Sequence, residues 1–259
     1  MTRVTAVPSW GDRVIEGEVN GHSALLYVDR PASILEVMES SARWAGRDYL
    51  VQNGRRLTFA DFRAAVGAVA GHLHREGVGP GDRVGIFATN SPEWVCTFFA
   101  VLHLGAIAVP YNGWWTEEEV TQASAVVSPH LIVADSRRAL RLHPGSRWLD
   151  IGGVSVPTGA GATPEPGEVR EDAPAVILFT AGTTGFPKGA TLTHRSLCAN
   201  LQTLLVVSRK LPGQIPDDLP PSVTLVGLPL FHMGAIQLML VPLVTGSKLV
   251  FLEGRFDAG

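Results

Sequence analysis

The stretch that decides the fold is Thr180-Ala-Gly-Thr-Thr-Gly-Phe-Pro-Lys-Gly189, which directly follows the apolar run Ala175-Val-Ile-Leu-Phe179. The apolar run predicts a buried strand. In the residues that follow the strand, Gly182 and Gly185 allow the backbone to approach a ligand closely, and successive N–H groups can converge on an anion. Threonine hydroxyls and the ammonium group of Lys188 supply further donors and a positive charge. The segment therefore predicts a phosphate-binding loop.

This loop differs from the common nucleoside-triphosphatase loop G-x-x-x-x-G-K-[ST], in which glycine directly precedes lysine. Here Pro187 precedes Lys188, and Gly189 follows it. Because proline lacks an N–H group and fixes φ, the backbone around the lysine must differ from that loop. The pattern argues against a kinase or a GTPase. The alternative to a phosphate loop is a strand-to-loop turn that binds nothing.

The same ten residues resemble the phosphate-binding signature of the adenylate-forming superfamily, [ST]-S-G-[ST]-T-G-x-P-K-G, with Ala181 in place of the usual serine. This superfamily includes acyl-CoA synthetases, peptide-synthetase adenylation domains and beetle luciferases. Trp114-Trp115-Thr116 is similar to the variant found in many fatty-acyl and medium-chain ligases. Other segments that match in the family's order extend the resemblance over roughly residues 33–257: Leu57-Thr-Phe-Ala-Asp-Phe62, Val78-Gly-Pro-Gly-Asp-Arg-Val84, Asn90-Ser-Pro-Glu-Trp94, Leu104-Gly-Ala-Ile-Ala-Val-Pro-Tyr-Asn112 and Leu228-Pro-Leu-Phe-His-Met-Gly234.

The resemblance implies a two-step reaction. A carboxylate, expected to be a fatty acid, attacks the α-phosphate of ATP to give an acyl-adenylate and pyrophosphate, and coenzyme A then displaces AMP. Mg²⁺ is implied as a cofactor, and Lys188 is implied to contact the β- and γ-phosphates. His232 is implied to line the acyl site, and no catalytic residue or metal ligand is assigned. The other residues implied to bind phosphate are Thr180, Gly182, Thr183, Thr184 and Gly185.

Members of the family are longer than this chain and carry downstream motifs that have no counterpart here: Y-G-x-T-E, T-G-D, a hinge and a C-terminal catalytic lysine. The expected function is therefore that of the N-terminal part of an AMP-forming acyl-CoA synthetase, incomplete for catalysis alone. The alternatives are a non-catalytic remnant or scaffold that retains the fold, and one half of a split enzyme. Neither the acyl chain length nor the thiol acceptor follows from the sequence.

The composition is that of a globular protein, with 46% hydrophobic and 17% charged residues among 259. A net charge of −3 without a basic block gives no support for nucleic-acid binding. Cys96 and Cys198 lack metal-ligand spacing and are expected to be buried or half-buried thiols. The chain opens without a secretory signal, and its longest apolar stretches, 94–110 and 234–244, are expected to be core helices. We therefore expect a cytoplasmic protein without a transmembrane segment.

Strands that alternate with helices predict an α/β fold with a parallel sheet. The resemblance implies two stacked αβ subdomains, the first nearly complete and the second truncated. Residues 1–30 are expected to form a loose N-terminal lead, 31–172 the first subdomain, and 173–259 the phosphate-loop segment and the start of the second. The Gly- and Pro-rich stretch 151–172 is either a linker or an excursion inside one domain. A truncated second sheet would expose an apolar edge, so self-association is expected.

Local signals predict individual elements. Ser33, Thr58, Ser91 and Thr116 are expected helix caps, and Asn53-Gly54 predicts a hairpin turn. His194 opens a helix, and we expect it to have a structural role. Trp114 and Trp115 are expected to pack beside a loop. The predicted helices span about 33–44, 59–75, 91–104, 116–125, 194–207 and 234–244. The predicted strands span 83–88, 106–110, 130–135, 148–151, 175–179, 223–228 and 248–252.

Overall fold

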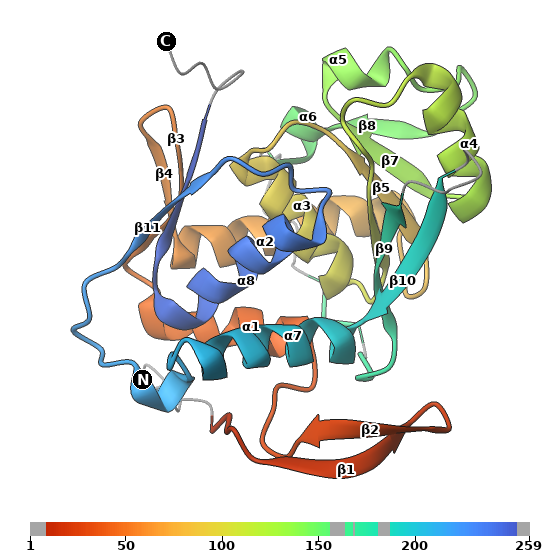
Figure 1. The fold of residues 1–259 in the computed structure, drawn as a ribbon. Coiled ribbons are helices and arrows are strands. Elements are labelled where there is room, and N and C mark those ends of the chain that lie inside the picture. The colour runs from red at the N-terminus through yellow and green to blue at the C-terminus, as the bar shows by residue number, and fades with distance from the viewer. Residues whose placement is uncertain (1–8, 156–163, 168, 181–186, 253–259) are drawn as a thin grey trace.

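The computed structural model describes residues 9–155, 164–167, 169–180 and 187–252. These residues form a six-stranded sheet, a four-stranded sheet and a separate two-stranded hairpin. Figure 1 shows the long helices α2, α3 and α8 between the two larger sheets. The predicted α/β class, with strands and helices in alternation, is confirmed.

The six-stranded sheet has the order β10-β9-β6-β5-β7-β8. All neighbouring strands in it are parallel except β10, which runs antiparallel to β9. The crossover helices are α3 (Pro92–His103) between β5 and β6 and α4 (Glu117–Val127) between β6 and β7. The strands are β5 (Arg83–Phe87), β6 (Ile107–Pro110), β7 (Leu131–Ala134), β8 (Trp148–Asp150), β9 (Pro174–Thr180) and β10 (Lys188–Thr193).

The four-stranded sheet has the order β11-β12-β3-β4 and joins segments that lie far apart in the chain. A hairpin of β3 (Asp48–Gln52) and β4 (Arg55–Thr58) turns at Asn53-Gly54, and both turn residues have positive φ as predicted. β12 (Lys248–Phe251) pairs in parallel with β3 and with β11 (Val223–Val226). Each of the two larger sheets takes strands from both sides of residue 172. The division into two subdomains at that position remains a prediction.

Within the described residues β11 is an edge strand of this sheet, and two of its aliphatic side chains are exposed. Val223 is 61% exposed and Leu225 is 51% exposed. Apolar edge strands are templates for pairing with another chain. These exposures agree with the expected apolar edge, while self-association itself stays a prediction.

The helices start where their capping residues predicted. The Ser33 hydroxyl accepts a hydrogen bond from the Glu36 N–H, and Thr58 forms a capping box with Asp61. Helix bounds are α1 (Ile34–Ser40), α2 (Phe59–Arg75), α5 (Ser136–Ala139), α6 (Ile151–Ser155), α7 (His194–Val207) and α8 (Met233–Thr245). Short 3₁₀ helices span Ser41–Trp44 and Pro212–Gln214.

An aromatic cluster joins the four-stranded sheet to the helices. The ring of Tyr49 on β3 stacks on Phe59 at a centroid distance of 4.7 Å and meets Phe62 edge-on at 4.8 Å. Its hydroxyl donates a 2.8 Å hydrogen bond to the carbonyl oxygen of Met239 on α8. Because this hydroxyl is buried and satisfied, the cluster fixes β3 against α2 and α8 without leaving an orphan polar group.

Residues 14–27 form a β-hairpin, so the prediction of a loose N-terminal lead is wrong there. β1 (Val14–Val19) pairs antiparallel with β2 (His22–Tyr27) around Asn20-Gly21, whose two φ angles are positive. Asn-Gly is a strong hairpin signal. The Gln202 side chain on α7 holds the base of the hairpin by donating to the carbonyl oxygens of Gly11 and Asp29, at 2.6 and 2.8 Å.

The described parts of the Gly- and Pro-rich stretch pack on α3. Ile151 and Val154 of α6 belong to the main hydrophobic core. His103 Nε2 donates to the Pro164 carbonyl oxygen at 2.9 Å, and Gly167 N–H donates to the His103 carbonyl oxygen at the same distance. These contacts favour the interpretation that the stretch 151–172 is an excursion inside one domain. Whether it is an excursion or a linker between domains is not decided by them.

Both cysteines are buried and free, as predicted. Burial raises the pKa of the Cys96 thiol and of the Cys198 thiol to about 12, so both stay protonated and unreactive near neutral pH. In the part of the chain that the structure describes, no helix is both long and apolar enough to cross a membrane.

Candidate functional site

The candidate site lies where the parallel strands of the six-stranded sheet end. Strands β5, β6, β7 and β9 are parallel, so their carboxyl ends meet at one edge of the sheet. Ligands of open α/β sheets bind in the crevice outside that edge. The segments that follow these strands therefore supply the candidate site residues.

Thr180 and Lys188 stand at the two ends of the predicted phosphate loop. Thr180 ends β9, Lys188 begins β10, and the two residues are directly opposed in the antiparallel register. The Thr180 hydroxyl lies 3.4 Å from the Lys188 carbonyl oxygen, to which it donates, and the Lys188 side chain is exposed. The structure thus brings both residues together at the mouth of the loop.

The inner residues of the loop, Gly182, Thr183, Thr184 and Gly185, lie outside the described residues. Gly189, just behind the loop, is described and sits tightly against β9. A Cβ there would approach Ile177 Cγ2 to 2.9 Å, so this register admits only glycine without a shift. The phosphate-binding roles of all six loop residues remain predictions.

A buried aromatic cluster supports the base of the loop. The ring of Phe179, next to Thr180, meets Trp115 edge-on at 5.0 Å and Tyr111 at 6.0 Å. The Tyr111 hydroxyl lies 3.0 Å from Ser124 Oγ on α4. Burial raises the pKa of Tyr111 to about 12, so its phenol stays neutral. Trp115 therefore packs beside the loop as predicted.

Trp114 behaves differently from its neighbour and departs from the prediction of packing. Its side chain is 68% exposed. The backbone N–H of Trp114 donates a 2.9 Å hydrogen bond to Asn112 Oδ1, and the indole ring meets Phe231 edge-on at a centroid distance of 5.4 Å. Both tryptophans follow the end of β6, where strand alternation no longer assigns a face, so the sequence could not separate them.

Two arginines that the sequence does not predict as site residues brace the segments after β6 and β7. Arg141 donates to the carbonyl oxygens of Trp115 and of Gly113, the latter at 3.0 Å. Arg138 donates to Asp135 Oδ2 at 2.7 Å. Burial opposes ionisation of Asp135, but hydrogen bonds from the Arg138 and Thr89 N–H groups, together with the Arg138 charge, outweigh burial and lower its pKa. The sequence signal for this contact is Asp135, which directly follows β7 and caps the N-terminus of α5.

His232 lies in the turn between β11 and α8, at the end of the other sheet. Its side chain is exposed, and its ring centroid lies 4.4 Å from that of Phe231. The Asn90 side chain holds this turn to the segment after β5, donating to the Leu228 carbonyl oxygen at 2.8 Å and accepting from the Leu230 N–H at 2.9 Å. Through Phe231 and Trp114, His232 is thus joined to the same connecting segment, 111–115, that supports the loop.

His194 has the structural role expected of it. It is 1% exposed, and its Nδ1 accepts a 3.3 Å hydrogen bond from the Ile34 N–H at the start of α1. Burial lowers the pKa of His194 to about 4, so the imidazole is neutral near pH 7. Its neighbour Arg195 forms ion pairs with Glu171 and Asp172, both at 2.6 Å. These contacts anchor the helix that follows β10.

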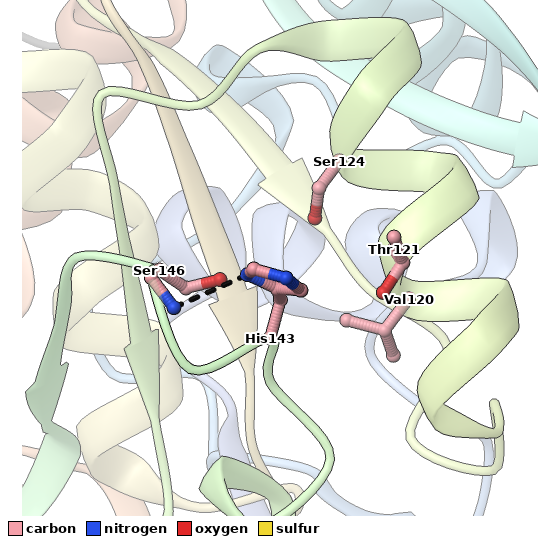
Figure 2. Close-up of a pocket in the computed structure, with 6 residues that line it drawn as sticks. Val120, Thr121, Ser124, His143 and Ser146 are labelled. Carbon is pink, nitrogen blue, oxygen red and sulfur yellow. Dashed lines mark hydrogen bonds between the residues drawn. The ribbon is translucent and has the colours of Figure 1, made fainter.

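A separate pocket of about 420 Å³ lies between α4 and the segment after α5. Figure 2 shows the His143 ring between Ser146 and the hydroxyl-bearing side chains of Thr121 and Ser124. His143 Nδ1 accepts a 3.1 Å hydrogen bond from the Gly145 N–H. The lining residues are Val120, Thr121, Ser124, His143, Gly145 and Ser146. They include no charged carboxylate, lysine or arginine and none of the predicted site residues.

The fold places this chain among α/β proteins in which a parallel sheet ends beside a strand–loop–strand unit, here with Lys188 at the end of the loop. The model of the AMP-binding enzyme family matches residues 37–258. This chain therefore belongs to the AMP-binding enzyme family. The resemblance inferred from its motifs is confirmed over nearly the same residues.

Several curated relatives are named as CoA ligases or CoA synthases, and the acids in their names differ. The chain is 32% identical over 235 residues to 4-coumarate–CoA ligase 2 of Oryza sativa subsp. japonica, covering 80% of this chain and 40% of that protein. It is 31% identical over 214 residues to a long-chain-fatty-acid–CoA ligase of Mycobacterium tuberculosis, covering 78% of this chain and 41% of that protein. The chain thus spans about 40% of the length of these relatives.

Solved structures show the same fold. The N-terminal subdomain of Klebsiella oxytoca NpsA, in complex with 3-hydroxybenzoyl-AMSN, matches with a TM-score of 0.73 and 21% identity, over 88% of this chain and 55% of that one. A Mycobacterium tuberculosis fatty acyl CoA synthetase matches with a TM-score of 0.72 and 25% identity, over 88% and 46% of the two chains. The similarity to N-terminal subdomains confirms the predicted fold of an acyl-CoA synthetase-like N-terminal domain.

Proposed function

We propose that this chain is the part of an ATP-dependent, AMP-forming acyl-CoA synthetase that holds the phosphates of ATP and one wall of the acyl site. The reaction is adenylation of a carboxylate, expected to be a fatty acid, followed by transfer of the acyl group to coenzyme A. The observation that carries the proposal is the direct opposition of Thr180 and Lys188 at the ligand-binding edge of the parallel sheet. A cytoplasmic location is part of the same proposal.

Lys188 stabilises negative charge on the β- and γ-phosphates as pyrophosphate leaves. Its ammonium group is exposed at the mouth of the loop, where an anion can reach it. Preorganised positive charge at a leaving group lowers the barrier to phosphoryl-type transfer. Thr180, Thr183 and Thr184 supply hydroxyl donors, and Gly182 and Gly185 supply backbone N–H groups.

The described ends of the loop suit the phosphates that would bring a Mg²⁺ ion with them, because the Thr180 hydroxyl and the exposed Lys188 are both donors. Mg²⁺ usually keeps several waters and binds through substrate phosphates with few protein ligands. When bound, the ion would supply further neutralisation of phosphate charge, while Lys188 and the hydroxyl groups orient the phosphates.

His232 borders the site for the acyl group. Its ring is exposed beside Phe231, and Asn90 fixes the turn that carries both. The relatives include ligases named for 4-coumarate, for ferulate and for long-chain fatty acids. A non-catalytic remnant or scaffold and one half of a split enzyme remain the alternatives.

Replacing Lys188 with alanine tests the phosphate role. We expect the affinity of the chain for MgATP and for inorganic tripolyphosphate to fall about ten- to a hundredfold, because a charge-assisted hydrogen bond contributes about 1.5–3 kcal/mol. Phosphorus-31 NMR titration measures both ligands, including weak binding. Lys210→Ala is the matched control, since this exposed lysine follows α7, away from the loop.

Equal affinities for the wild-type chain and Lys188→Ala would contradict the role of Lys188. Absence of binding to the wild-type chain at millimolar ligand would instead support the non-catalytic alternative. Weak MgATP binding that strengthens on addition of a second polypeptide with the downstream family motifs would support the split enzyme.

A further inference from the structure

We propose that Trp114 contacts the apolar chain of the bound carboxylate and, with Phe231, sets the affinity for long acyl chains. The inference deepens the proposed function and rests on it. Its starting observation is an indole that is 68% exposed although its backbone and its ring are both held in place. A large exposed aromatic side chain in a fixed position is characteristic of a binding surface.

The backbone of the segment that carries Trp114 is fixed by hydrogen bonds from Arg141 and to the Asn112 side chain. Arg141 donates to the carbonyl oxygens on both sides of Trp114, those of Gly113 and Trp115, and its guanidinium lies 4.8 Å from the Phe87 ring centroid. The Trp114 N–H is bound to the Asn112 side chain. Since the backbone is fixed at these points, little conformational entropy is lost when a ligand packs on the indole.

The opposite wall comes from the other sheet. Phe231 meets the Trp114 ring edge-on, and Leu228 in the same turn is 52% exposed. Asn90 ties this turn to the end of β5 through two hydrogen bonds. Trp114 and Phe231, in ring contact, and Leu228, exposed in the same turn as Phe231, make up the apolar patch of this proposal, and the ring of His232 lies next to Phe231.

The charged groups near this patch are already engaged. Arg141 is bound to backbone carbonyl oxygens, and Arg138 is bound to Asp135. Each guanidinium is therefore already paired with acceptors of the protein. The patch offers apolar contact, so it favours the hydrocarbon part of a carboxylic acid, whose transfer from water gains about 0.8 kcal/mol per buried CH₂.

The test compares decanoate with butanoate on the whole chain by isothermal titration calorimetry. The wild-type chain is expected to bind decanoate more tightly than butanoate. In Trp114→Ala the affinity for decanoate is expected to fall about tenfold, because losing the indole removes the contact of about two methylene groups. The affinity for butanoate is expected to change less than about twofold, because so short a chain ends before the indole.

Trp148→Ala is the matched control, because Trp148 is an exposed tryptophan on the edge strand β8 and is expected to leave both affinities unchanged. Phe231→Leu keeps an apolar side chain but removes the ring contact, and it is expected to weaken decanoate binding less than Trp114→Ala. Because the indole is exposed, the thermal unfolding midpoint of Trp114→Ala should match that of the wild type, which shows that the variant is folded.

Retention of full decanoate affinity in Trp114→Ala would overturn this inference and leave the proposed function standing. An equal loss for decanoate and butanoate would also overturn it, since that result indicates a general disturbance of the site. Failure of the wild-type chain to bind either acid, with MgATP binding intact, would overturn the acyl-site assignment together with the inference.

Discussion

Replacing Gly246 with alanine is expected to lower the free energy of unfolding by about 3 kcal/mol, the sum of a left-handed backbone penalty and overpacking. Gly246 ends α8 with φ +67°, and its N–H donates to the Pro242 carbonyl oxygen at 2.8 Å. A Cβ at this position would lie 2.6 Å from Trp44 Cδ2. Trp44 cannot easily yield, since its Nε1 donates to the Val244 carbonyl oxygen at 2.9 Å.

Urea denaturation followed by circular dichroism measures this change. Gly46→Ala is the control, because a Cβ at Gly46 would meet no atom within 4 Å and its φ is not positive. That variant is expected to match the wild type. If Gly246→Ala also unfolds at the wild-type urea midpoint, the packing of α8 against Trp44 is looser than the structure shows.

The stability of the chain is expected to fall by about 3 kcal/mol between pH 6.5 and pH 4 through His194 alone. Burial lowers the pKa of His194 from 6.5 to about 4 in the folded chain. Between these values the unfolded chain binds a proton that the folded chain rejects, so acid favours unfolding. The full contribution is present above pH 6.5 and is lost as the pH falls towards the folded pKa.

Unfolding free energies measured across this pH range for the wild type and His194→Asn isolate the effect. The asparagine side-chain oxygen stands in the place of Nδ1, so it can still accept from the Ile34 N–H. Because asparagine does not titrate, the slope of the unfolding free energy against pH should be smaller by the contribution of one proton. His74→Gln, at an exposed position near the end of α2, serves as the control variant. Identical slopes in all three proteins would show that His194 gains a proton without unfolding.

Local elements with capping or turn signals could be predicted from the sequence. The helix from Phe59 to Arg75 has its predicted bounds because Thr58 and Asp61 satisfy its first N–H groups. The hairpin turn at Asn53-Gly54 follows from residues that tolerate positive φ. The same signal stands at Asn20-Gly21, where β1 and β2 form a hairpin in place of the expected loose lead.

Contacts between distant segments could not be predicted in this way. β12 pairs with β3 across about two hundred residues, and no local pattern in either strand names its partner. The side chains of Arg141 and Asn90 donate hydrogen bonds to the carbonyl oxygens of Gly113 and Leu228, which come within reach of them only after the sheets have formed. The sequence therefore supplied the loop and His232 as candidates, but not the residues that brace them.

The order of strands and helices, the phosphate-loop motif and the family followed from the sequence, because they depend on short-range periodicity, caps and residue types at fixed spacing. The tertiary structure decided which edge carries the site, which of two adjacent tryptophans is exposed, and how the two sheets share strands. These features depend on burial and on contacts between residues distant in the chain. Such contacts form only when the backbone has folded and apolar surface has been removed from water.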